Sequence, residues 1–83
     1  MPRRGRGGLR RHQTLFVISL TINGQTVELE QPTPLMSYLE QLGVNARSIA
    51  VEHNGEIIPR TSFVHVTLRE GDTVEIVRMV GGG

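Results

Sequence analysis

Apolar and polar residues alternate from residue 16 to residue 30, on both sides of an Asn-Gly pair at 23–24. A period of two is typical of a β-strand with one buried face. Asn-Gly is the preferred pair of a two-residue type I′ turn, because both positions need a positive φ. A turn at this place sets Leu20 opposite Val27, so the apolar residues of both arms share a face. The pattern predicts a β-hairpin over 16–30.

After Pro32 the apolar spacing changes to that of a helix. The stripe consists of Leu35, Leu39 and Leu42, and either Met36 or Tyr38 widens it. Thr33 is predicted as the N-cap, with Pro34 at the first helical position, where its missing N–H costs nothing. Gly43 is predicted to end the helix. A helix this short and one-sided is expected to lie on the apolar face of a sheet.

Alternation returns in the second half of the chain. The predicted strands are 49–53, a short edge strand at 56–58 after the Asn-Gly pair 54–55, a partly irregular stretch at 62–68, and a last strand at 73–80. A hairpin, one helix and further strands predict an α+β fold, with the helix packed across one face of the sheet.

The length of 83 residues allows one domain. We expect an Arg/Gly-rich arm over 1–14, disordered for want of apolar residues, a folded domain over 15–80 and a flexible glycine tail over 81–83. The absence of cysteine excludes a disulfide framework and a cysteine-ligated metal site. It also fits a reducing compartment such as the cytoplasm.

Charge divides the chain. Five of the nine arginines lie in the first eleven residues, whereas the chain from residue 12 onward carries four arginines and eight carboxylates, a net charge of −4. An acidic body suits a partner with a basic face. The basic arm would suit RNA, or it is a leader or a mis-set start. The apolar run at 15–18 is too short to cross a membrane.

The sequence contains no catalytic constellation. His12 lies in the arm, and His53 and His65 lie in predicted strands without a second ligand at metal-binding spacing. Glu70 and Asp72 are expected to be ordinary turn residues. We therefore expect no enzyme activity, no metal and no bound cofactor.

The last predicted strand has apolar residues on both of its faces. Val74 and Ile76 are expected on the face toward the core, whereas Val77 and Met79 are expected on the opposite face. The second face of a sheet covered by one helix should be polar. Val77 and Met79 are therefore predicted to help dock a partner, unless a bulge or loop covers them.

Three stretches together resemble a known family: Ile-Asn-Gly at 22–24, Ile-Ala-Val-Glu-His-Asn-Gly-Glu-Ile-Ile-Pro-Arg at 49–60, and the run from Glu70 to the glycines 81–83. The chain resembles the ubiquitin-like β-grasp fold, and more specifically the ThiS family of sulfur carriers in thiazole synthesis for thiamine. The middle stretch distinguishes this family, because a terminal Gly-Gly is shared with the molybdopterin carrier and with ubiquitin-type modifiers. The resemblance implies a mixed sheet of four to five strands.

The resemblance also implies how the tail would act. A partner similar to ubiquitin-activating enzymes would use ATP to adenylate the Gly83 carboxylate, and a persulfide donor would convert the adenylate to a thiocarboxylate. Thiazole synthase would accept the sulfur. Gly81 and Gly82 would thread the partner's cleft, since a Cβ would crowd it. Neither a membrane nor a nucleic acid is implied.

Overall fold

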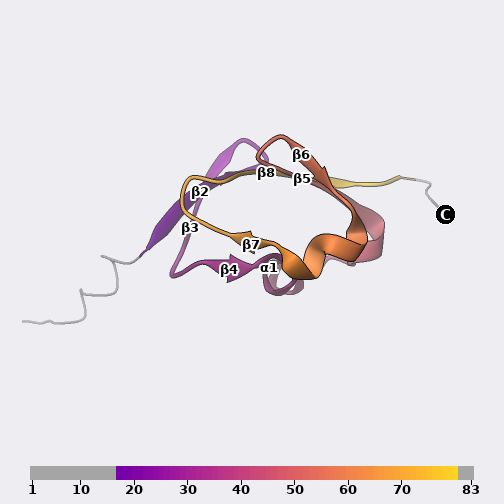
Figure 1. Cartoon of the computed structure of the whole chain (residues 1–83), viewed down its shortest axis with the longest axis horizontal. Helices are drawn as coiled ribbons and strands as arrows, with labels where there is room; N and C mark the ends of the chain where they lie inside the picture. The colour runs from indigo at the N-terminus through magenta and orange to yellow at the C-terminus, as the bar shows by residue number, and fades with distance from the viewer. Residues whose placement is uncertain (1–16, 81–83) are drawn as a thin grey trace, which may run out of the picture.

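The last strand in sequence lies at the centre of the sheet (Figure 1). The computed structural model describes residues 17–80. Its strands are β2 (Ile18–Ile22), β3 (Gln25–Leu29), β4 (Thr33–Pro34), β5 (Ile49–His53), β6 (Glu56–Ile58), β7 (Thr67–Leu68) and β8 (Thr73–Arg78). Its helices are α1 (Leu35–Leu42) and the 3-10 helices η2 (Ala46–Ser48) and η3 (Arg60–His65).

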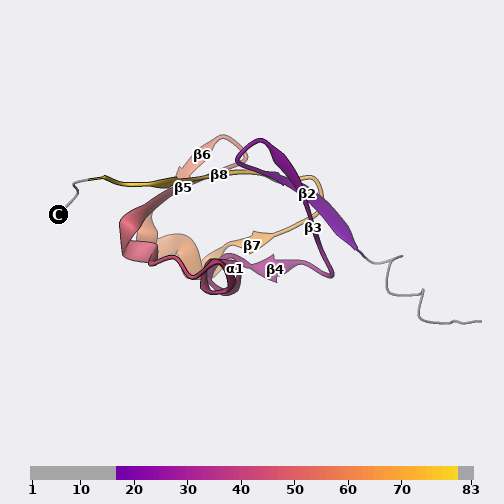
Figure 2. The same cartoon turned by 180° about the vertical axis from the view of Figure 1, so that it is seen from behind.

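Five strands form a mixed sheet in the order β3-β2-β8-β5-β6, and β4 pairs with β7 in a separate two-stranded ribbon. β8 is parallel to β2 and antiparallel to β5. Figures 1 and 2 show the large sheet as one layer, with α1 and the β4–β7 ribbon as the other. The predicted α+β fold, with a mixed sheet and one α-helix across a face, is confirmed.

The hairpin prediction is confirmed in its register. Leu20 pairs with Val27 and Ile18 with Leu29. Asn23 has a φ of 53° and Gly24 a φ of 80°, the positive values that a type I′ turn requires.

The core lies between the sheet and α1. The buried apolar residues are Ile18, Leu20, Ile22, Leu35, Tyr38, Leu39, Ile49, Val51, Phe63, Leu68 and Val74. Tyr38 rather than Met36 widens the helical stripe. Leu42, predicted as part of that stripe, is 49% exposed at the end of the helix.

The predicted N-cap is wrong. Thr33 and Pro34 form β4, and the hydroxyl of Thr33 donates to the Gln31 carbonyl rather than accepting from the helix. The carbonyl of Val66 accepts the Leu35 N–H at 2.9 Å instead. A backbone carbonyl next to β7 thus accepts the first N–H of the helix, a role that the sequence pattern assigned to the side chain of Thr33.

The predicted helix end is confirmed. Gly43 adopts a φ of 75°, its N–H donates to Glu40, and the Val44 N–H donates to Leu39. This pair of bonds is the Schellman motif, which glycine favours because it has no Cβ to strain a left-handed residue.

The stretch expected to be partly irregular contains η3, a 3-10 helix whose Phe63 is buried. His65 therefore lies at the end of a helix and not in a strand. The last two residues of the stretch form β7, so the expectation of a partly irregular stretch is confirmed, and the placement of His65 in a strand is wrong.

Candidate protein-docking site

The face of the sheet opposite α1 carries an apolar centre. Val77 on β8 pairs with Ala50 on β5, and Glu75 pairs with Glu52, which in turn pairs with Ile57 on β6. Side chains of directly paired residues project from the same face. Ala50, Ile57 and Val77, flanked by Glu52 and Glu75, thus form what we call the outer patch.

The outer patch is both exposed and hollowed. Ile57 is 76% exposed and Val77 is 55% exposed. A shallow hollow of about 380 Å³ lies over the patch and is lined by all five of its residues. Contiguous exposed apolar side chains rimmed by charges are typical of a protein-interaction surface.

The sequence reasoning found Val77 but missed Ala50 and Ile57. The register of the second Asn-Gly turn could have found Ile57. A two-residue turn at 54–55 sets residue 57 opposite Glu52, and a pair of adjacent isoleucines on a strand must send one side chain to each face.

Met79 does not share the hollow with Val77. It follows the end of β8, where its N–H donates to the Ser48 carbonyl at 2.8 Å, and it is 45% exposed. Met79 therefore extends the exposed apolar surface toward the C-terminus. The structure brings Val77 together with Ile57 rather than with Met79.

The predicted tail residues Gly81, Gly82 and Gly83, like His12 and the arm 1–14, lie outside the residues that the structure describes. The described part ends at Val80, which is 92% exposed. β8 leads from the centre of the sheet to this end of the chain (Figure 1). In the sequence the three glycines thus follow the central strand of the sheet within two residues of its end.

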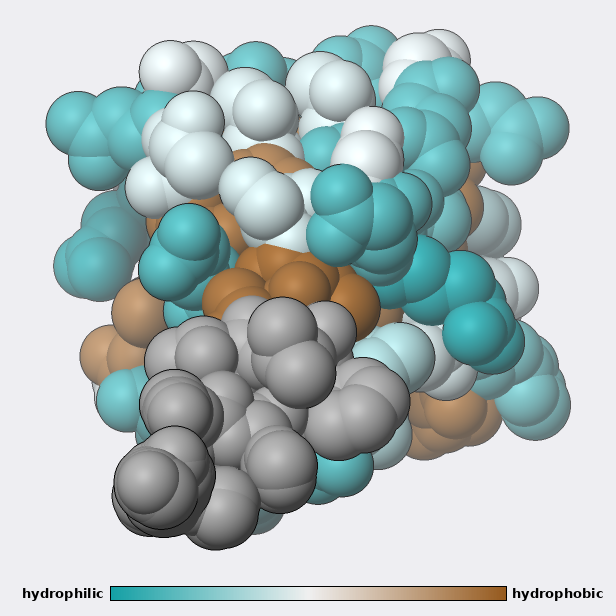
Figure 3. Space-filling model, turned by 90° about the vertical axis from the view of Figure 1, so that its left-hand side faces the viewer, coloured by the Kyte–Doolittle hydropathy of each residue, from teal (hydrophilic) through white to brown (hydrophobic). Residues whose placement is uncertain are grey.

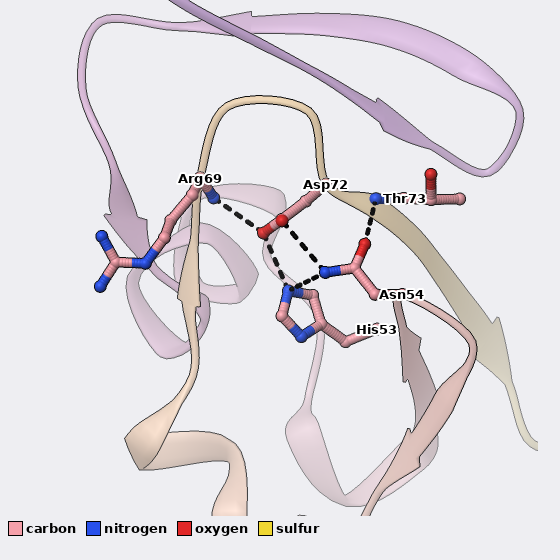
Figure 4. A network of polar contacts seen from close by, with 5 residues as sticks. All are labelled: His53, Asn54, Arg69, Asp72 and Thr73. Carbon is pink, nitrogen blue, oxygen red and sulfur yellow. Dashed lines mark hydrogen bonds and ion pairs between the residues drawn. The ribbon is translucent and has the colours of Figure 1, made fainter.

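A polar network lies at the opposite end of β8 (Figure 4). His53 Nε2 lies 2.8 Å from Asp72 Oδ2, which also accepts the Arg69 N–H at 2.8 Å. Asn54 donates its amide to Asp72 Oδ1 at 3.1 Å and accepts the Thr73 N–H at 2.9 Å. The network joins the β5–β6 turn to the turn before β8.

This network changes the role expected of Asp72. Burial by itself would raise the pKa of Asp72, but hydrogen bonds from His53, the Arg69 N–H and Asn54 outweigh it and lower the pKa below its ordinary value. Glu70 also does more than turn the chain, because its carboxylate accepts the Ser19 N–H at 2.8 Å. Both carboxylates hold neighbouring segments in place.

The polar network contains one histidine, His53, and one carboxylate, that of Asp72. Within residues 17–80, no group of three or more His, Cys, Asp or Glu residues could hold a metal ion.

Figure 3 views the end of the molecule away from the C-terminus, where the visible surface is mostly hydrophilic around a smaller hydrophobic area. In the same described range no helix has the length and apolar character needed to cross a membrane.

Comparisons with known proteins extend these observations. The sequence model of the ThiS family matches residues 15–83. The sulfur carrier protein ThiS of Bacillus subtilis is 34% identical over 65 residues, which cover 77% of this chain and 98% of that protein. A thiazole synthase of Paramagnetospirillum magneticum is 39% identical over 66 residues, which cover 80% of this chain but only 20% of the synthase.

A solved structure agrees with the fold. The crystal structure of the thiamine biosynthesis protein ThiS from Geobacter metallireducens has a TM-score of 0.69 and 33% sequence identity. The match covers 80% of this chain and 100% of that one. The mixed sheet with a single α-helix is thus the β-grasp arrangement expected from the sequence. This chain belongs to the ThiS family.

Proposed function

We propose that this ThiS-family chain carries sulfur as a thiocarboxylate at Gly83 and delivers it to thiazole synthase in thiamine biosynthesis. The sulfur-carrier role follows from the family, whose Bacillus subtilis member is a sulfur carrier protein. The observation that carries the proposal is the position of β8, which links the centre of the sheet directly to a run of three glycines.

The length of the tail suits a reaction inside a partner. Three extended residues span roughly 10 Å, so a carboxylate at Gly83 reaches into a cleft while the folded domain stays outside. Glycine at 81–83 keeps the tail narrow and free to adopt any φ. The chain supplies the substrate group, and the partner enzymes supply the catalytic groups.

The chemistry needs activation, because a carboxylate is a poor acceptor for a sulfur nucleophile. The Gly83 carboxylate attacks the α-phosphate of ATP on an adenylating enzyme and releases pyrophosphate. A protein persulfide then displaces AMP, and reduction of the resulting S–S bond by a thiol leaves the thiocarboxylate. ATP is used by the partner and is not a resident cofactor of this chain.

We assign docking of these partners to the outer patch together with Met79. Ile57 and Val77 supply the apolar contact, and Glu52 and Glu75 favour a partner with basic residues at the matching positions. The thiazole synthase of Paramagnetospirillum magneticum includes a region similar to this chain, which supports thiazole synthase as the acceptor. We place these reactions in the cytoplasm.

The proposal is tested by intact-mass analysis after incubation with the organism's adenylating enzyme, ATP and a persulfide donor. The unmodified chain is expected to gain the mass of one oxygen-to-sulfur exchange. Deletion of Gly83 or the substitution Gly82→Ala is expected to abolish the gain, because each changes the terminus that enters the cleft.

Met36→Ala, an exposed change on α1, serves as the control and is expected to gain sulfur normally. Thermal unfolding of each variant shows that the fold is unchanged. Failure of the unmodified chain to gain sulfur, with an adenylating enzyme that activates another carrier, overturns the proposal.

A further inference from the structure

The edge of β8 that faces β2 is paired over only part of its length. β2 and β8 pair at Thr21–Thr73 and Ile22–Val74, and the Asn23 N–H donates to the Val74 carbonyl at 2.8 Å. Backbone groups of a strand point to alternate sides. Val74, Ile76 and Arg78 therefore present their N–H and C=O groups to this same edge.

Asn23 ends the pairing with its side chain. Its Oδ1 accepts the Ile76 N–H at 2.7 Å, and its Nδ2 donates to the Ile76 carbonyl at 3.2 Å. The amide thus occupies both backbone groups of Ile76, as the next residue of a neighbouring strand would. The chain itself has already turned away into the β2–β3 hairpin.

Beyond Asn23 the two edges of β8 differ. On the β5 side, pairing continues to Ile49–Arg78, and the Met79 N–H donates to Ser48. On the β2 side, no residue within 17–80 hydrogen-bonds to the backbone of Arg78. Figures 1 and 2 show this end of β8 running on past the hairpin. We call Arg78–Val80 the open edge.

An apolar groove lies beside the open edge on the helix side of the sheet. It encloses about 330 Å³, and its lining includes Val27, Tyr38, Leu42, Ile76 and Arg78. Leu42, left half-exposed at the end of α1, forms part of its wall. Where β2 would continue if it were longer, there is thus both unpaired backbone and room for a side chain.

We propose that the open edge receives an added β-strand from the enzyme that binds the C-terminal tail. Such a strand pairs with the backbone of Arg78, and alternate side chains point to the groove. The apolar lining of the groove favours an apolar side chain on the added strand. The guanidinium of Arg78, which also lines the groove, favours a carboxylate on that strand. This inference rests on the proposed function, because the tail leads into the same enzyme.

The charge of Arg78 favours an enzyme strand over a second copy of the chain as the occupant of the open edge. Antiparallel pairing of two open edges sets the Arg78 residues of both copies close together, and like charges on neighbouring strands repel. A strand of the enzyme has no such cost, and it extends the pairing along the residues that lead to Gly83. Strand addition thereby fixes the direction in which the tail enters.

Amide hydrogen exchange measured by NMR on the full chain tests the pairing directly. The Arg78 amide is expected to exchange fast in the free chain and at least about tenfold more slowly with the purified adenylating enzyme or thiazole synthase, because a hydrogen bond must open first. The Met79 amide, bonded to Ser48, is the internal reference and is expected to be protected in both states. The inference is overturned if the Arg78 amide still exchanges fast in the saturated complex with the adenylating enzyme and also in the saturated complex with thiazole synthase.

A pair of substitutions separates the contribution of the Arg78 backbone N–H to binding from that of its side chain. Arg78→Ala removes the guanidinium and keeps the N–H, whereas Arg78→Pro removes both and places a ring against the added strand. A proline at an unpaired edge position leaves the sheet intact, which thermal unfolding checks. We expect Arg78→Pro to bind about tenfold more weakly than Arg78→Ala, because a partner carbonyl is left without a donor.

The outcomes separate the two proposals. If the unmodified chain gains sulfur but Arg78→Pro binds as well as Arg78→Ala, the strand addition is wrong and the carrier function stands. If the unmodified chain neither binds nor gains sulfur, the proposed function itself is wrong. Protection of Arg78 that rises with chain concentration in the absence of an enzyme assigns the edge to a second copy and overturns the inference.

Discussion

Asp72 shows how one side chain holds two distant turns together. It accepts hydrogen bonds from His53 and Asn54 of the β5–β6 turn and from the Arg69 backbone. Because the pKa of Asp72 is lower in the folded chain than in the unfolded chain, the network stabilises the fold above the unfolded pKa. That stabilisation is lost as the pH falls through the folded-state pKa.

Asp72→Asn is therefore expected to lower the free energy of unfolding at pH 7 by about 1–3 kcal/mol, since it replaces a charged acceptor by a neutral one. Urea unfolding at pH 7 and at pH 3 measures the effect. The difference from the unmodified chain should shrink at pH 3, which lies below the pKa of an aspartate in the unfolded chain, because the unfolded chain then takes up the proton. Glu56→Gln, on the exposed β6 strand, is the control, and an equal loss of stability in both variants contradicts the prediction.

Single-residue roles were only partly readable from the sequence. Asn23 and Asn54 were predicted as turn residues, because Asn-Gly pairs carry a strong local signal. Their second role depends on Ile76 and Thr73, which are distant in the sequence. A turn propensity says nothing about what the turn side chain will bond to across the sheet.

At the scale of elements, local signals succeeded where the structure is locally determined. The first hairpin and the helix end at Gly43 follow from turn chemistry and from backbone conformation. The prediction of the helix start was wrong because it depends on the pairing of β4 with β7, which lie more than thirty residues apart in the sequence. The outer patch was predicted only in part for the same reason. The alternation along β8 placed Val77 on the outer face, but Ala50 and Ile57 lie on other strands, and their position beside Val77 depends on strand pairing.

The outer patch allows a matched comparison of two exposed valines. Val77→Asp is expected to weaken binding to the adenylating enzyme or thiazole synthase at least about tenfold, because it places a charge in a desolvated contact. Val64→Asp is the control, since Val64 is 66% exposed on η3, outside the patch. Isothermal titration calorimetry compares the two, and equal weakening by both variants argues against the patch as the docking surface.

At the scale of the whole molecule, the charges of the outer patch follow from the proposed docking role and not from a gain in stability. Glu52 and Glu75 are paired directly across β5 and β8, and like charges at such positions destabilise a sheet. The chain from residue 12 onward is acidic as a whole, with a net charge of −4. An acidic surface of this kind speeds association with a basic one.

Glu75→Gln is expected to have opposite effects on stability and binding. It should raise the free energy of unfolding by about 0.2–1 kcal/mol, because the repulsion is removed. It should also slow association with the partner and flatten the dependence of the association rate on salt. Stopped-flow binding at several salt concentrations tests this, with Glu40→Gln on α1 as the control. Faster association at low salt contradicts the prediction.

The central place of β8 has a consequence for synthesis of the chain. A strand that is last in sequence but central in the sheet is made after every element it must bridge. During translation the β2–β3 hairpin and the β5–β6 pair can form early, but they cannot join until β8 leaves the ribosome. A truncated chain without β8 has two parts of a sheet that no strand joins. Under the proposed function, a chain that stops before β8 therefore lacks both a joined sheet and the tail that the adenylating enzyme would modify.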